Sequence, residues 1–484
     1  MTPREPSPKM LWACCAVLAL VSCSGGAGLL PGLSRKAWEL PPPPVTDALV
    51  VREGTLHREV LGNGLEIVVL EDHRLPRASI GVAFRRGEGM VPRDEAGAAS
   101  FTAALLERGA GERSALEFAQ YVDEVGARFG AVAAWDETRV GASGLSRDLD
   151  RLFEVLADAV LRPHLSVEEA VRERTELLAS LERSKDDPAT LAAWHTAKAL
   201  YPKHRYGLPI TGDTESVERL DAGVARAFHA RVFIPNDAIF YASGDVGAAD
   251  VVARVRRAFG DWKRGEVAPA GPPPPERVPE SRQVVIVDRP DLAQARVAVA
   301  HEGLRRTDDD RIPASLLNLV IGGGGFSSRL MAALRTDAGL TYSVGSGFSL
   351  RRHPGPFRVS TFTRVAEVRR VLDLVLGELK RGVEEPPGQD ELGWARPLAT
   401  GRFSMGLETS DAVLESLVNL DIHGLPRDGL DTYRQRVRAV TEEDVARVAK
   451  QYLHPDRILI VLVGPAEDLR EQVSDLGSVR VVRP

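Results

Sequence analysis

The apolar residues of the chain follow two patterns that recur in its first and second halves. Short stretches of alternating or continuous apolar residues predict β-strands. These stretches are residues 65–70, 78–84 and 238–244 in the first half and 284–287, 295–300 and 458–464 in the second. Apolar residues at helical spacing precede the last strand of each half, in 224–232 and 442–452. Because strands and helices recur in the same order, the sequence predicts two copies of one αβ unit.

Polar residues mark where several helices begin. Ser114 is followed three residues later by Glu117, and Ser166 by Glu169, so both pairs fit the capping-box pattern. We expect helices to start at these two serines. A further helix, opened by Asp94, is expected after a glycine-rich turn.

Segments rich in proline and glycine divide the chain. Residues 265–282 contain four consecutive prolines, which favour an extended linker. Residues 24–54 are rich in Gly and Pro and are expected to form a flexible tether. The expected domains are therefore residues 55–264 and 283–484.

The composition narrows the class of protein. With 484 residues, of which 44% are hydrophobic and 27% charged, the chain is long enough for two domains with substantial cores. A net charge of −6 and dispersed basic residues give no reason to expect a nucleic-acid partner. The three cysteines all lie within the first 23 residues, so the rest of the chain forms no disulfide and no cysteine metal site.

The first 23 residues have the pattern of a secretory signal. Two basic residues precede an apolar run too short to span a bilayer. Residues 20–23, Leu-Val-Ser-Cys, resemble the bacterial lipobox, which implies cleavage before Cys23 and lipidation of its thiol. Ser24 then favours the outer membrane, by resemblance to such lipoproteins. The expected location is the periplasmic side of a bacterial envelope; a signal peptide without a lipid is the alternative.

The stretch from Gly322 to Val344 carries the most specific motif. A glycine run leads into a helix with Arg335 near its end, and Tyr342 follows seven residues later in a Gly-Leu-x-Tyr turn. This order resembles the C-terminal half of the M16 family of zinc metallopeptidases, which includes pitrilysin, insulinase and the mitochondrial processing peptidase. The resemblance covers nearly all of residues 58–470. It implies an α+β fold of two homologous domains, each a mixed, mostly antiparallel sheet with helices packed on one face, forming half of a clamshell.

The resemblance also implies roles for individual residues. Arg335 and Tyr342 would hydrogen-bond the carbonyl region of a peptide, because arginine offers a planar set of donors and tyrosine a hydroxyl. The glycine run would line the chamber and let the peptide backbone approach closely. The substrate-binding residues implied in this way are Gly323, Gly324, Gly325, Phe326 and Ser327. The run could instead be a phosphate loop, but the Lys-Ser/Thr of such a loop is absent.

In the family, a helix of the first half carries His-x-x-Glu-His. Its two histidines bind Zn²⁺ from one helical face, and the Glu takes the proton from the metal's water. At the matching place this chain has Ser100 and Ala104 instead of the histidines and Ala103 instead of the Glu. No histidine occurs between His73 and His164, so a shifted alignment does not restore the motif.

The third family ligand is also missing. Ser180 stands at its position, although Glu173, which matches a supporting acid of the family, is kept. His195 and His204 pair with no second ligand at helical spacing and are interpreted as structural. The sequence therefore predicts that this chain binds no metal of its own.

Three hypotheses remain open from the sequence. In the first, the chain is a non-catalytic subunit that pairs with a His-x-x-Glu-His homologue, which holds the zinc, and supplies Arg335 and Tyr342 in trans during peptide degradation. In the second, it is a scaffold or peptide-binding envelope lipoprotein without enzymatic activity. In the third, it is an active peptidase that uses another metal or other ligands.

Overall fold

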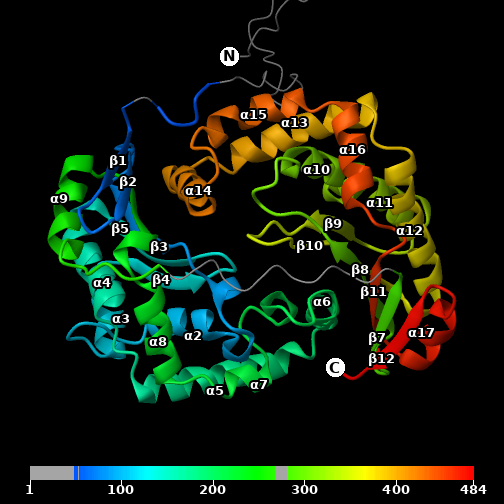
Figure 1. Cartoon of the computed structure of the whole chain (residues 1–484), viewed down its shortest axis with the longest axis horizontal. Coiled ribbons are helices and arrows are strands. Elements are labelled where there is room, and N and C mark those ends of the chain that lie inside the picture. Colours follow the sequence, from blue (N-terminus) through cyan, green and yellow to red (C-terminus); the bar gives the residue numbers. More distant parts are fainter. Residues whose placement is uncertain (1–47, 53, 268–280) are drawn as a thin grey trace, which may run out of the picture. The chain divides into compact units, whose positions relative to one another are not determined.

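The computed structural model describes residues 48–52, 54–267 and 281–484 (Figure 1). The signal sequence with Cys23, most of the expected tether and most of the proline-rich linker lie outside the described residues. Within the described part, no helix combines the length and apolar character needed to cross a membrane.

The first half contains a six-stranded sheet and the helices that cover it. Its strands are β1 (Leu56–Val60), β2 (Glu66–Glu71), β3 (Arg77–Phe84), β4 (Arg128–Ala133), β5 (Thr138–Leu145) and β6 (Ala238–Gly244). Its helices are α2 (Ala98–Leu105), α3 (Ala115–Asp123), α4 (Leu149–Leu161), α5 (Val167–Ser184), α6 (Pro188–Leu200), α7 (Thr214–Val217), α8 (Ala222–Val232) and α9 (Ala248–Phe259).

The second half repeats this plan. Its strands are β7 (Gln283–Asp288), β8 (Gln294–Glu302), β9 (Val344–Phe348), β10 (Pro356–Arg364), β11 (Leu459–Gly464) and β12 (Ser478–Val482). Its helices are α10 (Arg311–Asn318), α11 (Arg329–Met331), α12 (Val368–Glu384), α13 (Gln389–Met405), α14 (Ser410–His423), α15 (Gly429–Ala439), α16 (Glu442–Tyr452) and α17 (Ala466–Val473).

The two sheets have matching strand orders, β1-β2-β6-β3-β5-β4 and β12-β7-β11-β8-β10-β9. In both, a parallel pair (β2 with β6, β7 with β11) adjoins a run of antiparallel pairs that ends at an edge strand, β4 or β9. The outer strands differ, because β1 is antiparallel to β2 whereas β12 is parallel to β7. The expected α+β fold of two homologous domains with mixed, mostly antiparallel sheets is confirmed.

Strict alternation along the central strands places apolar side chains on both sheet faces. On β2, Ile67 and Val69 enter the main core of the first half, under its own helices. Val68 and Leu70 point the other way and pack with Leu417 of α14, a helix of the second half. Each sheet therefore has helices of its own half on one face. Part of its other face is covered by a helix that belongs to the other half.

The second sheet is likewise covered in part by a helix of the first half. Helix α6 belongs to the first half, and its Leu191 packs in a cluster with Val285 of β7 and Val461 of β11. Figure 1 shows α14 beside the first sheet and α6 beside the second. Because apolar burial is the main stabilising term in folding, these two clusters tie the halves together.

Most expected elements form within one or two residues of their expected bounds. Ser114 caps α3 in a full capping box, and Ser166 accepts a hydrogen bond from the Glu169 amide at the start of α5. The expectation that Asp94 opens the next helix is wrong. Asp94 lies in a short 3₁₀ turn, and α2 begins only after Gly97, whose φ of 96° interrupts the helical path.

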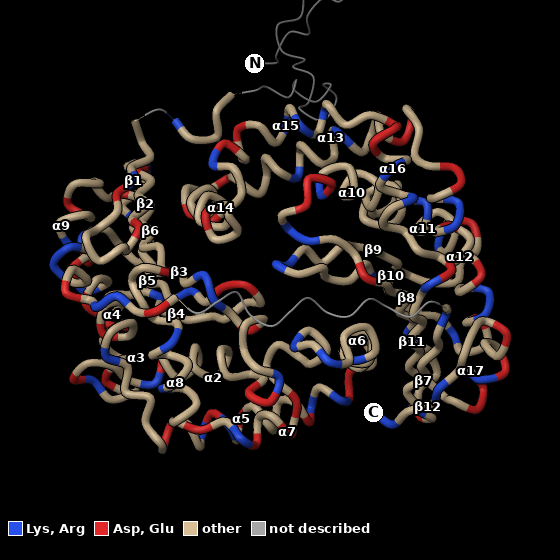
Figure 2. The backbone as a smooth tube through the Cα atoms, viewed as in Figure 1, with Lys and Arg blue, Asp and Glu red and all other residues tan. Residues whose placement is uncertain are grey.

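Charged residues of both signs are interspersed along the helices. Figure 2 shows Lys and Arg positions mixed with Asp and Glu positions along α5, α9 and α12. Several of them form ion pairs one helical turn apart, such as Arg172 with Glu168 on α5 and Arg254 with Asp250 on α9. These helices therefore present no surface of a single charge.

Candidate functional site

Arg335 and Tyr342 lie next to one another on the surface of the second half. Arg335 belongs to a π-helical segment, Ala332–Asp337, and its Nη1 donates a hydrogen bond to the main-chain carbonyl of Tyr342 at 3.0 Å. The guanidinium carbon lies 4.5 Å from the centroid of the Tyr342 ring and 4.7 Å from that of the Phe326 ring. Cation–π attraction therefore holds the arginine against both rings.

The two rings are open to solvent. Phe326 is 71% exposed and Tyr342 is 72% exposed. Among the described residues, the bond to the Tyr342 carbonyl is the only hydrogen bond of the Arg335 guanidinium, and the Tyr342 hydroxyl makes none. Single exposed aromatic residues are common, but two that flank an arginine with free donors form a surface suited to a ligand.

The glycine run has a packing role of its own. A Cβ on Gly324 would lie 2.7 Å from the Trp394 ring, so only glycine fits beneath α13. The carbonyl oxygen of Gly323 accepts a hydrogen bond from Arg402 Nη1 at 2.9 Å. These two residues, expected to bind substrate, are thus already in contact with a neighbouring helix.

The end of the run is a turn that brings side chains to the surface. Gly325 has a φ of 65°, which favours glycine, and its carbonyl accepts a hydrogen bond from Ser328 Oγ at 2.7 Å. Phe326 and Ser327, between them, are exposed. Of the five expected substrate-binding residues, these two and Gly325 are the ones with open space beside them.

Helix α2 holds the positions that match the metal motif of the family. Ser100 Oγ donates a hydrogen bond to the carbonyl of Ile210 at 3.3 Å, and Ala103 is buried, 2% exposed. The side chains of Ala103 and Ala104 have no atom that can bind a metal. Ser180 is exposed on α5, the neighbouring helix. These residues do not fit a zinc site, which needs three or four N, S or O ligands.

No other group of ligands replaces them in the part of the chain that the structure describes. Across residues 48–52, 54–267 and 281–484, no three His, Cys, Asp or Glu side chains come together in an arrangement that could hold a metal ion. Glu173, the supporting acid, pairs instead with Arg108, whose Nη2 lies 3.1 Å from Glu173 Oε2. The carboxylate is thereby engaged beside the end of α2.

A buried ion pair holds the start of α2. Both side chains of the pair, Glu88 and Arg205, are fully buried, and Arg205 Nη2 lies 2.7 Å from Glu88 Oε1. The Glu88 carboxylate also accepts hydrogen bonds from the amides of Gly97, Ala99 and Ser100, at 2.5, 3.0 and 3.2 Å. A negative charge at a helix N-terminus satisfies its free amides and its dipole. Sequence reasoning missed this pair, because 117 residues separate its members.

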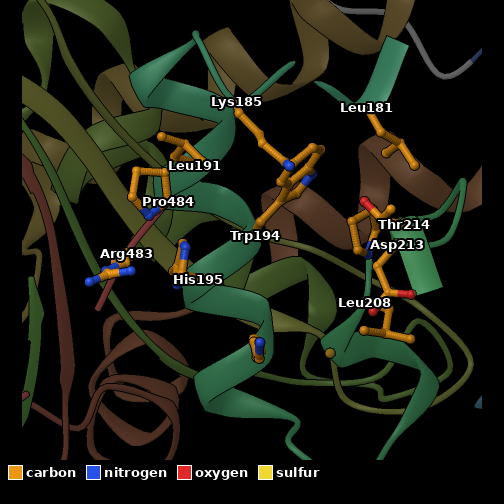
Figure 3. Close-up of a pocket in the computed structure, with 13 residues that line it drawn as sticks. Leu181, Lys185, Leu191, Trp194, His195, Leu208, Asp213, Thr214, Arg483 and Pro484 are labelled. Carbon is orange, nitrogen blue, oxygen red and sulfur yellow. The ribbon is translucent and has the colours of Figure 1, made fainter. Parts of the chain in front are cut away.

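A separate cavity of about 240 Å³ lies between α5, α6 and residues 207–214 (Figure 3). Its walls include Leu181, Trp194 and Leu208, with Lys185 from the end of α5. His195 lines it too, and burial lowers the pKa of that imidazole, so it is neutral at pH 7. The cavity shares no lining residue with the surface around Arg335.

The family assignment follows from this fold and these motifs together. Residues 66–214 match the family description "Insulinase (Peptidase family M16)", and residues 219–396 match "Peptidase M16 inactive domain". An uncharacterised zinc protease of Streptomyces coelicolor is 30% identical over 423 residues, 86% of this chain and 91% of the relative. The chain belongs to the M16 peptidase family.

Two further comparisons concern members described as inactive. The crystal structure of a peptidase M16 inactive domain from Pseudomonas fluorescens has a TM-score of 0.77 and 27% identity, and covers 85% of this chain and 98% of that one. The non-peptidase homologue YmxG of Helicobacter pylori is 23% identical over 412 residues, 84% of this chain and 93% of its own length. This chain is an M16 family member that lacks the metal motif, with Ser100, Ala103 and Ala104 at its positions.

Proposed function

We propose that the chain is the non-catalytic subunit of a two-chain M16 zinc peptidase. It forms part of the peptide chamber and supplies Arg335 and Tyr342 to the active site of a partner that carries His-x-x-Glu-His. The zinc belongs to the partner, and the assembly degrades peptides.

The observation that carries this proposal is an asymmetry between the two halves. The first half lacks both histidines of the motif and its glutamate, with Ser100, Ala104 and Ala103 in their places. The second half keeps Arg335 and Tyr342, places them in contact and leaves their free donors exposed. A chain without any role in peptide chemistry would have no use for this second element.

The hydrogen-bond donors of Arg335 and Tyr342 suit a peptide carbonyl oxygen. Hydrogen-bond donors that are already in place when negative charge develops on a peptide oxygen stabilise the transition state. Contact with Phe326 and Tyr342 limits the rotamers of Arg335, so less entropy is lost when its free N–H groups bind. The Tyr342 hydroxyl adds a second donor.

We place the assembly on the periplasmic side of a bacterial envelope, anchored through a lipid on Cys23. The support is the lipobox-like sequence alone. Replacing Cys23 by serine should release the protein from the membrane fraction and abolish labelling with radioactive palmitate. Unchanged membrane association and labelling would refute the anchor.

The in-trans role is tested by co-expressing the chain with an M16 homologue that carries His-x-x-Glu-His and comes from the same genome. Arg335→Ala should lower the kcat of the purified complex about a hundredfold, and Tyr342→Phe about tenfold, the range seen when an oxyanion donor is removed. The matched control is Arg151→Ala with Tyr121→Phe, because Arg151 lies over the Tyr121 ring at 4.0 Å in the first half.

Two outcomes would contradict the proposal. Peptidase activity that is unchanged in both Arg335 and Tyr342 variants would exclude the in-trans role. A stable homodimer in gel filtration that ignores the homologue would favour the non-enzymatic scaffold or peptide-binding lipoprotein instead.

A further inference from the structure

Three glycines lie side by side on neighbouring strands of the first sheet, and we call this row the glycine floor. Gly81 on β3 is paired in register with Gly141 on β5, and Gly141 with Gly130 on β4. Tyr241 on β6 is the partner of Gly81 on the other side. The Tyr241 ring lies across Gly81, because a Cβ there would be 2.4 Å from the ring and its hydroxyl.

The second sheet fills the same positions differently. By register, Gly81 and Tyr241 hold the places of Ala298 and Val461, which are buried in the cluster beneath α6. Helix α6 thus packs on an apolar surface of the second sheet. In the first half, the Tyr241 ring covers Gly81 and packs against the apolar cluster under α14, and its hydroxyl lines a cavity.

A cavity of about 380 Å³ lies over Gly130 and Gly141, beside Tyr241. At one end, Asp411 at the start of α14 accepts hydrogen bonds from the hydroxyls of Ser79 at 2.9 Å and Ser243 at 2.5 Å. Arg77 lies 3.4 Å from the same carboxylate. The acceptor capacity of Asp411 is therefore largely used by the protein itself.

The remaining polar groups of the lining are mostly donors without a partner. In the described structure, the Arg128 guanidinium and the hydroxyls of Ser143 and Tyr241 make no hydrogen bond. Arg139 Nη2 pairs with Glu137 at 3.0 Å, but Arg139 Nε is buried without a partner. Burial raises the pKa of Tyr241 to about 12, so this phenol is protonated and can donate at neutral pH. The other carboxylate of the lining, Glu415, is exposed, as is Arg128, so solvent screens the charges of both; the buried donors of the lining are those of Tyr241 and Arg139.

We propose that this cavity binds a carboxylate group of a peptide, either an acidic side chain or the C-terminal carboxylate. Guanidinium and hydroxyl donors suit a carboxylate, which only accepts hydrogen bonds. Gly130 and Gly141, which have no side chains, leave space in the cavity for the ligand. That the ligand is a peptide rests on the proposed function. The cavity would add to that function by selecting which peptides the chamber binds.

The test measures binding of fluorescent peptides to the purified chain without a partner, by fluorescence anisotropy. Three probes share an alanine-rich sequence of nine residues. The first has one glutamate and blocked termini, the second has glutamine at that place, and the third has glutamine and a free C-terminal carboxylate. Tighter binding of the first probe identifies the side chain as the ligand, and of the third probe the terminus.

Three variants connect binding to the cavity. Arg128→Gln should weaken binding of the preferred probe about tenfold, the loss expected for one charge-assisted hydrogen bond, and Tyr241→Phe about threefold. Gly130→Val should abolish binding by filling the floor; an added Cβ there meets only the distant Glu107 carboxylate, 3.8 Å away. Arg172→Gln on α5 is the control, because that residue does not line the cavity. Thermal unfolding checks that each variant folds.

The outcomes separate this inference from the proposed function. Equal binding of all three probes, no binding of any probe, or binding unaffected by Arg128→Gln and Gly130→Val would overturn the carboxylate site. None of these results would change the effect of Arg335→Ala on the activity of the complex, which tests the in-trans role.

Discussion

Replacing Glu88 by alanine tests how the metal-free helix α2 is held in place. Glu88 is fully buried, and its carboxylate bonds Arg205 and three amides at the start of α2. Alanine would leave the Arg205 guanidinium buried without a counter-charge and the helix without its cap. We expect the protein to lose about 4 kcal/mol of stability, since breaking a buried ion pair costs roughly 3–5 kcal/mol.

The loss of stability expected for Glu88→Ala depends on the burial of the Glu88 carboxylate rather than on its charge alone. Glu117 also caps a helix, since its carboxylate accepts from the Ser114 amide at 2.9 Å, but it stands in solvent. Glu117→Ala should cost much less stability than Glu88→Ala, because solvent already surrounds this cap. The double variant Glu88→Leu with Arg205→Met should be more stable than Glu88→Ala, because it leaves no lone buried charge.

Urea unfolding followed by circular dichroism and by tryptophan fluorescence measures these differences. The free energies are compared where the two probes give coincident transitions. If Glu88→Ala were no more destabilising than Glu117→Ala, the buried pair would not be what positions α2.

Three further predictions concern other parts of the structure. Arg351→Ala should destabilise the protein by about 2 kcal/mol in urea unfolding, because the guanidinium lies 4.3 Å from the Trp135 ring and is largely desolvated. Burial lowers the pKa of His204 from 6.5 to about 4, so below pH 6.5 the unfolded chain binds more protons and stability falls toward pH 4. His204→Gln should therefore flatten the decline in stability between pH 7 and pH 5. Gly324→Ala should lower the melting temperature by several degrees, because the methyl group would overlap the Trp394 ring; an unchanged melting temperature would refute this packing role.

The strands that the sequence predicted well are those buried on both faces. β6 has the expected bounds, because Ile239 and Phe240 are both fully buried on opposite faces and residues 238–242 are all aliphatic or aromatic. The edge strands β1 and β12 were not predicted. None of their side chains is buried, so no apolar pattern marks them, and they form because neighbouring strands offer free main-chain groups.

The candidate site was foreseen only in part. The resemblance to the M16 family gave Arg335 and Tyr342 and the loss at Ser100, and the structure then brought Phe326 against the arginine. The glycine row ending at Gly130 is invisible in sequence, because its members come from three strands. The pairing register of the three strands, rather than the spacing of the glycines along the chain, brings these glycines side by side.

We infer that this chain binds no zinc and acts through a partner that does. The most direct measurement is the metal content and peptidase activity of the purified chain alone, set beside those of the complex with a His-x-x-Glu-His homologue. We predict negligible zinc and no cleavage for the chain alone, and about one zinc per complex with chelator-sensitive cleavage. About one zinc bound to the isolated chain, with chelator-sensitive cleavage of peptides, would contradict the account.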